Sequence, residues 1–98
     1  MIRHVVMFRW KAGVTAADVE AIAAALSGLP GRIAEIRSFE HGPDLHAVDG
    51  NADYAVAAVF DSIDDFLTYR NHPAHMAFLT DVLAPRLEQR LAVQFDVG

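Results

Sequence analysis

Residues 54–60, Tyr-Ala-Val-Ala-Ala-Val-Phe, constrain the fold of this chain more than any other segment, because they are apolar on both sides. Successive side chains of a strand point to opposite faces of a sheet, so a strand with one wet face alternates apolar and polar residues. This segment does not alternate, and residues 5–8, Val-Val-Met-Phe, are apolar on both sides in the same way. A sheet that contains these strands must therefore be covered on both faces.

The rest of the chain predicts how many strands accompany them. Apolar alternation or apolar runs predict strands at 2–10, 33–41, 54–60 and 91–97. The first strand places Ile2, His4, Val6, Phe8 and Trp10 on one face. Gly42-Pro43 is expected to end the second strand, and a long polar loop follows at 44–52.

Two helical segments lie between these strands. Thr15 and Asp18 have the spacing of a capping box, and the helix that they begin is expected to stop at residues 28–31, Gly-Leu-Pro-Gly. Ser62 with Asp65 begins a second helix, which His72-Pro73 interrupts before a further helical segment starts at Pro73. The order strand, helix, strand, strand, helix, strand predicts a single α+β domain over residues 1–98. It is the ferredoxin-like βαββαβ fold, with a four-stranded antiparallel sheet and helices on one face.

Helices on one face leave the other face of the sheet uncovered, and no sequence remains to cover it. Hydrophobic residues make up 53% of the 98 residues, slightly more than is usual for a globular chain. A second copy of the chain is the most economical cover for the second apolar face. We therefore predict a homodimer in which two sheets pack together as a dimeric α/β barrel.

The charge of the chain argues against several kinds of partner. The net charge is −5, and the eight basic residues form no stripe that could neutralise a phosphate backbone, so nucleic acid is not an expected partner. The same acidity disfavours an anionic membrane surface, and no apolar run is long enough to span a bilayer. Without cysteine the chain has neither disulfides nor thiol nucleophiles, and with no apolar leader we expect a cytoplasmic protein. No glycine-rich phosphate loop or Gly-x-Ser-x-Gly motif is present.

The residues most suited to chemistry lie in the segment 69–75, Tyr-Arg-Asn-His-Pro-Ala-His. With Pro73 at the first helical position, His72 becomes the N-cap and His75 lies in the first turn, where the positive end of a helix disfavours a cation. A neutral His75 could act as a general base, with Tyr69 in the same corner. The alternative is that His72-Pro73 is only a helix-breaking turn and His75 a packed histidine. Zinc binding by His72 and His75 has weaker support, because two imidazoles are too few ligands.

The remaining histidines and Tyr54 can be interpreted without a catalytic role. His4 lies in an apolar row, where it is either a core histidine with satisfied hydrogen bonds or a residue that lines a pocket. Tyr54 on the central strand has the same two interpretations. His41 lies just before the loop 44–52 and His46 lies within it, and both are expected to be solvated.

The chain resembles the Dabb family, the stress-responsive dimeric A/B barrel domains, over nearly its whole length. The motifs that carry the resemblance are Ile2-Arg3-His4-Val5-Val6-Met7-Phe8, Leu29-Pro30-Gly31, Ile36-Arg37-Ser38-Phe39-Glu40, Phe60-Asp61-Ser62, and above all Tyr69 with His72-Pro73-Ala74-His75.

The resemblance implies a ferredoxin-like subunit whose sheet packs on that of a second copy. Family members with known activity are plant polyketide cyclases that perform an intramolecular aldol condensation without a cofactor. By resemblance, Tyr69 and His75 would be the acid/base pair, and His4 would line a pocket between sheet and helices. Tyr54 stands where the cyclase has another histidine, and the first helix has small residues at 21 and 23–25, so the substrate does not carry over.

The leading hypothesis is a cofactor-free, metal-free homodimer that binds a small apolar or polyketide-like molecule and possesses acid/base chemistry of the aldol type. Tyr69 and His75 are the candidate catalytic residues. The candidate substrate-binding residues are His4, Val6, Phe8, Tyr54, Val56 and Phe78. Two alternatives stay open: a non-catalytic stress-responsive dimer, and a cofactor-independent monooxygenase, which fold analogy alone supports.

Overall fold

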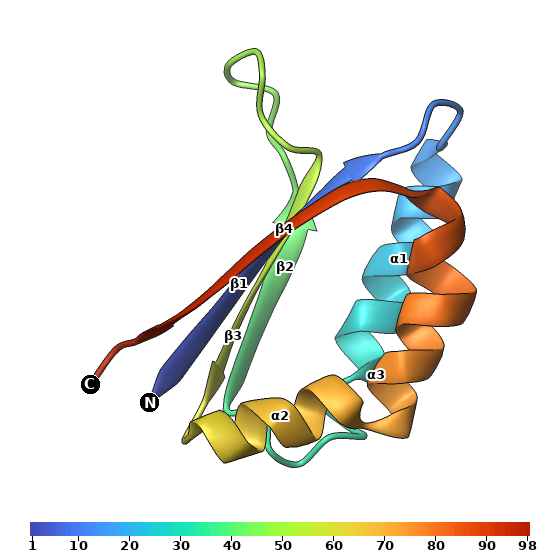
Figure 1. Ribbon diagram of the computed structural model, residues 1–98. Helices are drawn as coiled ribbons and strands as arrows, with labels where there is room; N and C mark the ends of the chain where they lie inside the picture. The colour runs from blue at the N-terminus through green and yellow to red at the C-terminus, as the bar shows by residue number, and fades with distance from the viewer.

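A computed structural model describes the whole chain, residues 1–98 (Figure 1). The strands are β1 (Ile2–Trp10), β2 (Ser38–Pro43), β3 (Tyr54–Phe60) and β4 (Leu87–Asp96). The helices are α1 (Ala16–Gly28), α2 (Ile63–Asn71) and α3 (Pro73–Ala77). A wider π-helical turn (Phe78–Leu83) and a 3₁₀ turn (Ala84–Arg86) connect α3 to β4. No helix is both long and apolar enough to cross a bilayer.

The four strands form one antiparallel sheet in the order β2-β3-β1-β4. This confirms the predicted ferredoxin-like fold. All three helices lie on the same side of the sheet: α1 and α3 run side by side, and α2 crosses below them at the end that holds the chain termini (Figure 1). The termini lie next to each other, and the Met1 amino group donates a hydrogen bond to the Gly98 carbonyl at 2.9 Å.

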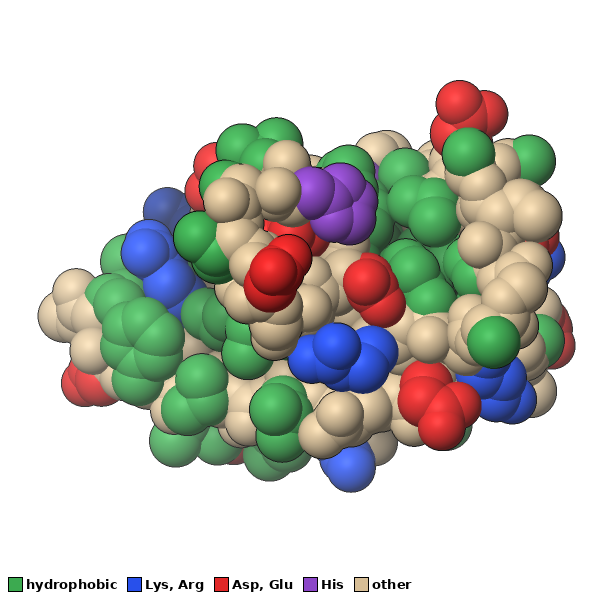
Figure 2. Space-filling model, turned by 90° about the horizontal axis from the view of Figure 1, so that it is seen from above, with side chains coloured by type: hydrophobic (Ala, Val, Ile, Leu, Met, Phe, Trp, Pro, Cys, Tyr) green, Lys and Arg blue, Asp and Glu red, His purple; other side chains and the backbone are tan.

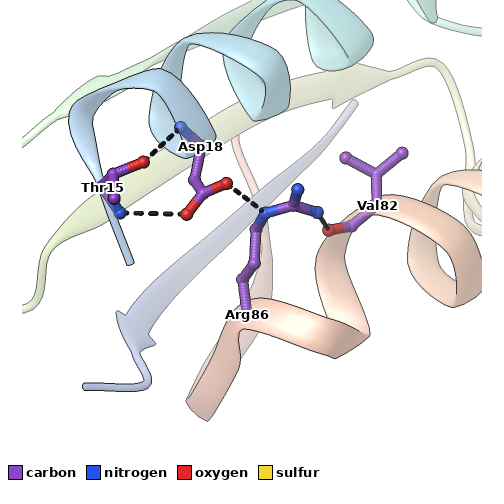
Figure 3. Close-up of polar contacts among 4 residues, drawn as sticks. All are labelled: Thr15, Asp18, Val82 and Arg86. Carbon is purple, nitrogen blue, oxygen red and sulfur yellow. Dashed lines mark hydrogen bonds and ion pairs between the residues drawn. The ribbon is translucent and has the colours of Figure 1, made fainter. Parts of the chain in front are cut away.

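The start of α1 is fixed by the capping box that the sequence predicted. The Thr15 hydroxyl accepts from the Asp18 backbone N–H at 3.1 Å, and the Asp18 carboxylate accepts from the Thr15 N–H at 3.0 Å. Arg86 joins this cap: its Nε lies 3.3 Å from the Asp18 carboxylate, and it donates a hydrogen bond to the Val82 carbonyl at 2.8 Å (Figure 3). The cap of α1 is therefore linked to the turn that leads into β4.

The break between α2 and α3 has the predicted form. His72 has an extended backbone, with φ −64° and ψ 137°, as expected of a residue before proline. Its Nδ1 accepts the Ala74 N–H at 3.0 Å, so His72 is the N-cap of α3, and Pro73 takes the first helical position. The helix is shorter than expected, because regular α-helical hydrogen bonding ends at Ala77 and wider turns follow.

Three predicted strand boundaries are wrong. Residues 33–37 form turns, in which Ile33 and Ile36 donate backbone hydrogen bonds to Leu29 and Ile33, and β2 begins only at Ser38. Ile33 is buried, but as an anchor from a turn rather than as part of a strand. Gly42-Pro43 does not end β2, because β2 is an edge strand and an edge tolerates a proline with no N–H to donate. The last strand starts at Leu87 rather than at residue 91.

The core lies between the sheet and the helices. The row of β1 that faces the helices, which contains His4, Val6 and Phe8, is buried, as are Tyr54, Val56, Ala58 and Phe60 on β3. Ile22 and Leu26 of α1 pack on them. The opposite face of the sheet is also rich in apolar side chains, but here they are exposed. We call this surface the open face, and its most exposed apolar residues are Met7, Leu91, Val93 and Phe95.

Candidate functional site

Three ring side chains from three elements meet at the end of the sheet that α2 crosses. His4 comes from β1, Tyr69 from the last turn of α2 and His75 from the first turn of α3. The Tyr69 ring centroid lies 4.3 Å from that of His75 and 6.0 Å from that of His4. All three are buried, with 3%, 8% and 3% of Tyr69, His75 and His4 exposed. The break at His72-Pro73 returns the chain toward α2, which places His75 against Tyr69.

The hydrogen bond of His75 fixes which of its nitrogens can act as a base. Its Nδ1 lies 3.0 Å from the Arg70 carbonyl, and since a carbonyl can only accept, Nδ1 carries the proton. In the neutral ring Nε2 then has a free lone pair. Burial lowers the pKa of His75, and the positive charges of Arg90, Arg70 and His72 lower it further, against the raising effect of the Arg70 carbonyl. The ring is therefore neutral at pH 7. Burial, rather than the end of the five-residue α3, is the main cause.

His4 has the opposite tautomer. The Gln94 amide of β4 donates to His4 Nδ1 at 2.9 Å, so in the neutral ring the proton is on Nε2. Burial lowers the pKa of His4 to about 4, and the charges of Arg90 and His75 act in the same direction. His4 is thus a neutral hydrogen-bond donor, which is suited to binding a carbonyl oxygen.

Tyr69 completes the set as a phenol that keeps its proton. Burial raises its pKa to about 12, although the charge of Arg90 acts to lower it. Its hydroxyl has no hydrogen-bond partner in the protein, and neither has Nε2 of His4 or of His75. No fully buried polar side-chain atom lacks a partner anywhere in the chain. These three atoms are therefore reachable from outside the protein, although the rings that carry them are largely buried.

A cavity of about 440 Å³ opens beside His75. Leu79, Leu83 and Leu87 form its apolar wall, and the Arg70 and Arg90 side chains border it. A larger cavity of about 680 Å³ lies beneath the loop between β2 and β3, where Met7, Leu91 and Ala55 of the open face contribute to its wall. We take the smaller cavity as the candidate site, because His75, whose pKa is lowered, lines it and the Tyr69 ring lies 4.3 Å from that of His75.

Of the predicted site residues, only His75 lines this cavity; Tyr69 and His4 lie behind it as neighbouring rings. Val6, Phe8, Val56 and Phe78 pack in the hydrophobic core. Tyr54 is 2% exposed and stacks on Phe8, at the other end of the sheet from His4. Substrate binding by these five residues stays a prediction.

Three site features were missed in the sequence. His41, expected to be solvated, is half-buried: its Nδ1 lies 2.6 Å from the Tyr54 hydroxyl and its Nε2 lies 2.9 Å from the Ser27 hydroxyl. Burial lowers its pKa. Gln94 and Arg90 were also missed, because their relation to His4 and to the cavity appears only from the pairing of β4 with β1, which places Gln94 opposite His4 and Arg90 opposite Phe8.

His72 and His75 both hydrogen-bond the backbone through Nδ1. Nowhere in the chain do three or more His, Asp or Glu side chains gather as they would around a metal ion. The site consists of a neutral base, two neutral donors and nearby arginines.

The comparison with protein families agrees with this architecture. The family described as Stress responsive A/B Barrel Domain, Dabb, matches residues 2–97. The chain belongs to the Dabb family. The comparison with curated proteins returned no match.

Solved structures of similar fold include proteins of unknown function and one named enzyme. A dimeric ferredoxin-like protein of unknown function from Thermobifida fusca is 45% identical, with a TM-score of 0.91, over 98% of this chain and 90% of that one. A dimeric protein of unknown function and ferredoxin-like fold from Bacteroides fragilis is 28% identical, with a TM-score of 0.81, over 97% and 94% of the two chains. Hydroxynitrile lyase from Passiflora edulis is 22% identical, with a TM-score of 0.86, over 99% and 93%. At that identity, the likeness to the lyase shows the fold alone.

Proposed function

We propose that this Dabb protein is a homodimer that binds a small apolar or polyketide-like molecule in the cavity beside His75 and catalyses an aldol-type ring closure there without a cofactor. The observation that supports this most directly is the pairing of a neutral His75, whose free Nε2 is a base, with a Tyr69 phenol at a ring distance of 4.3 Å. Both groups are in the protonation states that general acid/base catalysis needs at neutral pH.

The first step is the removal of a proton from carbon. His75 Nε2 accepts a proton from the carbon between two carbonyl groups of the ligand, which leaves an enolate and an imidazolium. The His4 Nε2–H and the Tyr69 hydroxyl are donors that can hydrogen-bond the oxygen on which the charge develops. The nearby charge of Arg90, which lowers the pKa of all three rings, favours the same anion.

The second step forms the ring. The enolate carbon attacks a second carbonyl of the same molecule, so a carbon–carbon bond forms and the attacked oxygen becomes an alkoxide. The alkoxide takes a proton from Tyr69, and the His75 imidazolium returns its proton to the phenolate. Both residues end as they began, and no electron leaves the substrate, so the reaction needs no oxidant.

The experiment compares wild-type protein with His75→Ala on a panel of linear β-polyketones, followed by the appearance of cyclised product. We expect product with wild type and none above background with His75→Ala. His46→Ala, at an exposed loop histidine, is the matched control and should retain the wild-type rate. A quinol and an aromatic cyanohydrin belong in the panel, because oxidation of the quinol would favour the monooxygenase alternative and the Passiflora relative is a hydroxynitrile lyase.

Equal rates for wild type and His75→Ala would overturn the proposal. A protein that neither binds nor converts any of these compounds would favour the non-catalytic alternative.

The homodimer is the second part of the proposal, and the open face supports it. Met7, Leu91, Val93 and Phe95 expose between 42% and 59% of their surface on one face of the sheet. Figure 2 shows apolar side chains grouped at the surface on the side of the molecule that carries the strands. Contiguous exposed apolar surface of this kind marks an interaction site. Its position on a sheet face suits the self-complementary packing of two copies.

A further inference from the structure

We propose that the ligand of the cavity beside His75 carries an anionic group, a carboxylate on an apolar body, and that Arg70 and Arg90 bind this group. The inference deepens the proposed function, since it places the ligand in the same cavity and adds its chemical class.

The first observation is that two arginines from different elements border one cavity. Arg70 stands in the last turn of α2, and its backbone carbonyl holds His75 Nδ1 at 3.0 Å. Arg90 stands on β4 opposite Phe8, a residue of the helix-facing row, so it lies on the same side of the sheet as the helices. Both border the cavity of about 440 Å³. A guanidinium group can bind a carboxylate through both of its oxygens.

The second observation is that neither arginine has an acidic partner. The arginines that form ion pairs are Arg37, with Asp61, and Arg86, with Asp18. No acidic side chain lines the cavity, although the chain as a whole has a net charge of −5. In an acidic protein, two unpaired arginines at the mouth of one apolar cavity form a local positive site, to which an anion is attracted.

The third observation is that the permanent charges beside the site are positive. Arg70 and Arg90 border the cavity, and no carboxylate acts on the pKa values of His4, Tyr69 and His75. A ligand with a cationic group would be repelled there. The wall of leucines would receive the apolar body of the ligand, with the carboxylate held at the arginine side and the reactive carbon toward His75.

The test measures binding and requires no turnover. The probes are 4-phenylbutanoate and its amide, 4-phenylbutanamide, which share one shape and differ in charge. Calorimetric titration at low salt should show the acid binding to wild type about tenfold more tightly than the amide, as expected for charge-assisted hydrogen bonds. In Arg70→Gln/Arg90→Gln the two probes should bind equally, and in wild type the preference should shrink as salt is added.

Two controls separate a local effect from a change in net charge. Arg32→Gln removes one positive charge from an exposed position outside this cavity, as Arg90→Gln alone does beside it, and should keep the full preference for the acid that Arg90→Gln reduces. Arg90→Lys keeps the charge without the planar fork and should keep part of it. All substituted positions are exposed, so the variants should fold as the wild type does.

The outcomes separate this inference from the proposed function. Equal affinity of wild type for acid and amide, or binding of neither, would overturn the anion site. His75-dependent cyclisation is tested separately by the polyketone assay. A preference for the acid that the double substitution abolishes would support the anion site, even if no β-polyketone were converted. A preference that Arg32→Gln reduces as strongly as the double substitution would also overturn it.

Discussion

Two buried tyrosines in this protein differ in one respect, the partner of their hydroxyl. Tyr54 is hydrogen-bonded to His41 at 2.6 Å, whereas the Tyr69 hydroxyl has no partner in the protein. We therefore predict that Tyr69→Phe changes the free energy of unfolding by less than about 0.5 kcal/mol, since no hydrogen bond is lost. Tyr54→Phe should cost about 1 kcal/mol, because it leaves His41 without a buried partner.

The same pair should behave in the opposite way in catalysis. Tyr69→Phe should lower the rate of ring closure by about a hundredfold or more, the usual contribution of a general acid. Tyr54→Phe should leave the rate within a few-fold of wild type, because its hydroxyl is committed to the Ser27–His41 chain. Urea unfolding and the polyketone assay on the two variants provide both measurements. A large stability loss in Tyr69→Phe with an unchanged rate would make Tyr69 a structural residue.

His4 makes the stability of the protein depend on pH. Its pKa falls from 6.5 to about 4 on folding, so below pH 6.5 the unfolded chain binds more protons than the folded one. The contribution of neutral His4 to the free energy of unfolding is therefore fully present above pH 6.5. About 3 kcal/mol of it is lost as the pH falls toward 4. His75 and His41, whose pKa values are also lowered, add to the loss in the same direction.

The measurement is urea unfolding at several pH values for wild type and His4→Gln. The variant should show a shallower decline of stability between pH 6.5 and pH 4, whereas His46→Gln should decline as the wild type does. Three carboxyls also have lowered pKa values: Asp18, Asp44 and Asp96. They contribute little to the change between pH 6.5 and pH 4, because their stabilising effect is lost mainly as the pH falls below 3.8, the ordinary pKa of an aspartate. Identical slopes for wild type and His4→Gln would contradict the assignment.

At the scale of elements, the cap of α1 is a joint between two parts of the fold. Thr15 and Asp18 satisfy the first turn of α1, and Asp18 also binds Arg86 ahead of β4. Thr15→Ala should lower the free energy of unfolding by about 1 kcal/mol, the usual cost of removing an N-cap. Thr68→Ala is the matched control: its hydroxyl bonds a carbonyl within α2, and removing it should have little effect. Thermal and urea unfolding of both variants test this. Equal losses in the free energy of unfolding would show that the Thr15 cap contributes no more than an ordinary side-chain hydrogen bond.

The elements also indicate how far sequence patterns reach. Capping signals and prolines are local, so the start of α1, the N-cap of α3 and the break at His72-Pro73 could be read directly. In the strand predicted at 33–41, residues 33–37 form turns instead, because a turn can also bury apolar residues such as Ile33. His75 and Tyr69 could be paired through that break, whereas Gln94 and Arg90 could not be assigned to the site. Their place depends on the register of β4 against β1, which no local pattern fixes.

At the scale of the whole molecule, the open face explains the two-sided strands of the sequence. Val5 and Met7 pair with Val93 and Leu91 across the strands, so their side chains form one continuous apolar strip on the side without helices. Burying such a strip against its copy should remove at least about 1,000 Å² from water, the size that a specific interface needs. The free energy gained by apolar burial, about 25 cal/mol per Å², then outweighs the entropy lost on association.

We therefore predict that the protein is a dimer at micromolar concentration and that Val93→Glu makes it a monomer. A carboxylate in the middle of the strip would be buried without a partner in the dimer, which costs several kcal/mol, whereas in the monomer it is solvated. Val93 is already 55% exposed in the single chain, so the substitution should leave the fold intact, as circular dichroism can check. Leu67→Glu places the same charge on an exposed residue of α2, away from the open face, and should stay dimeric. Sedimentation equilibrium on the three proteins tests this prediction. The open face is not the dimer interface if wild type sediments as a monomer. The same conclusion follows if Val93→Glu is as dimeric as Leu67→Glu.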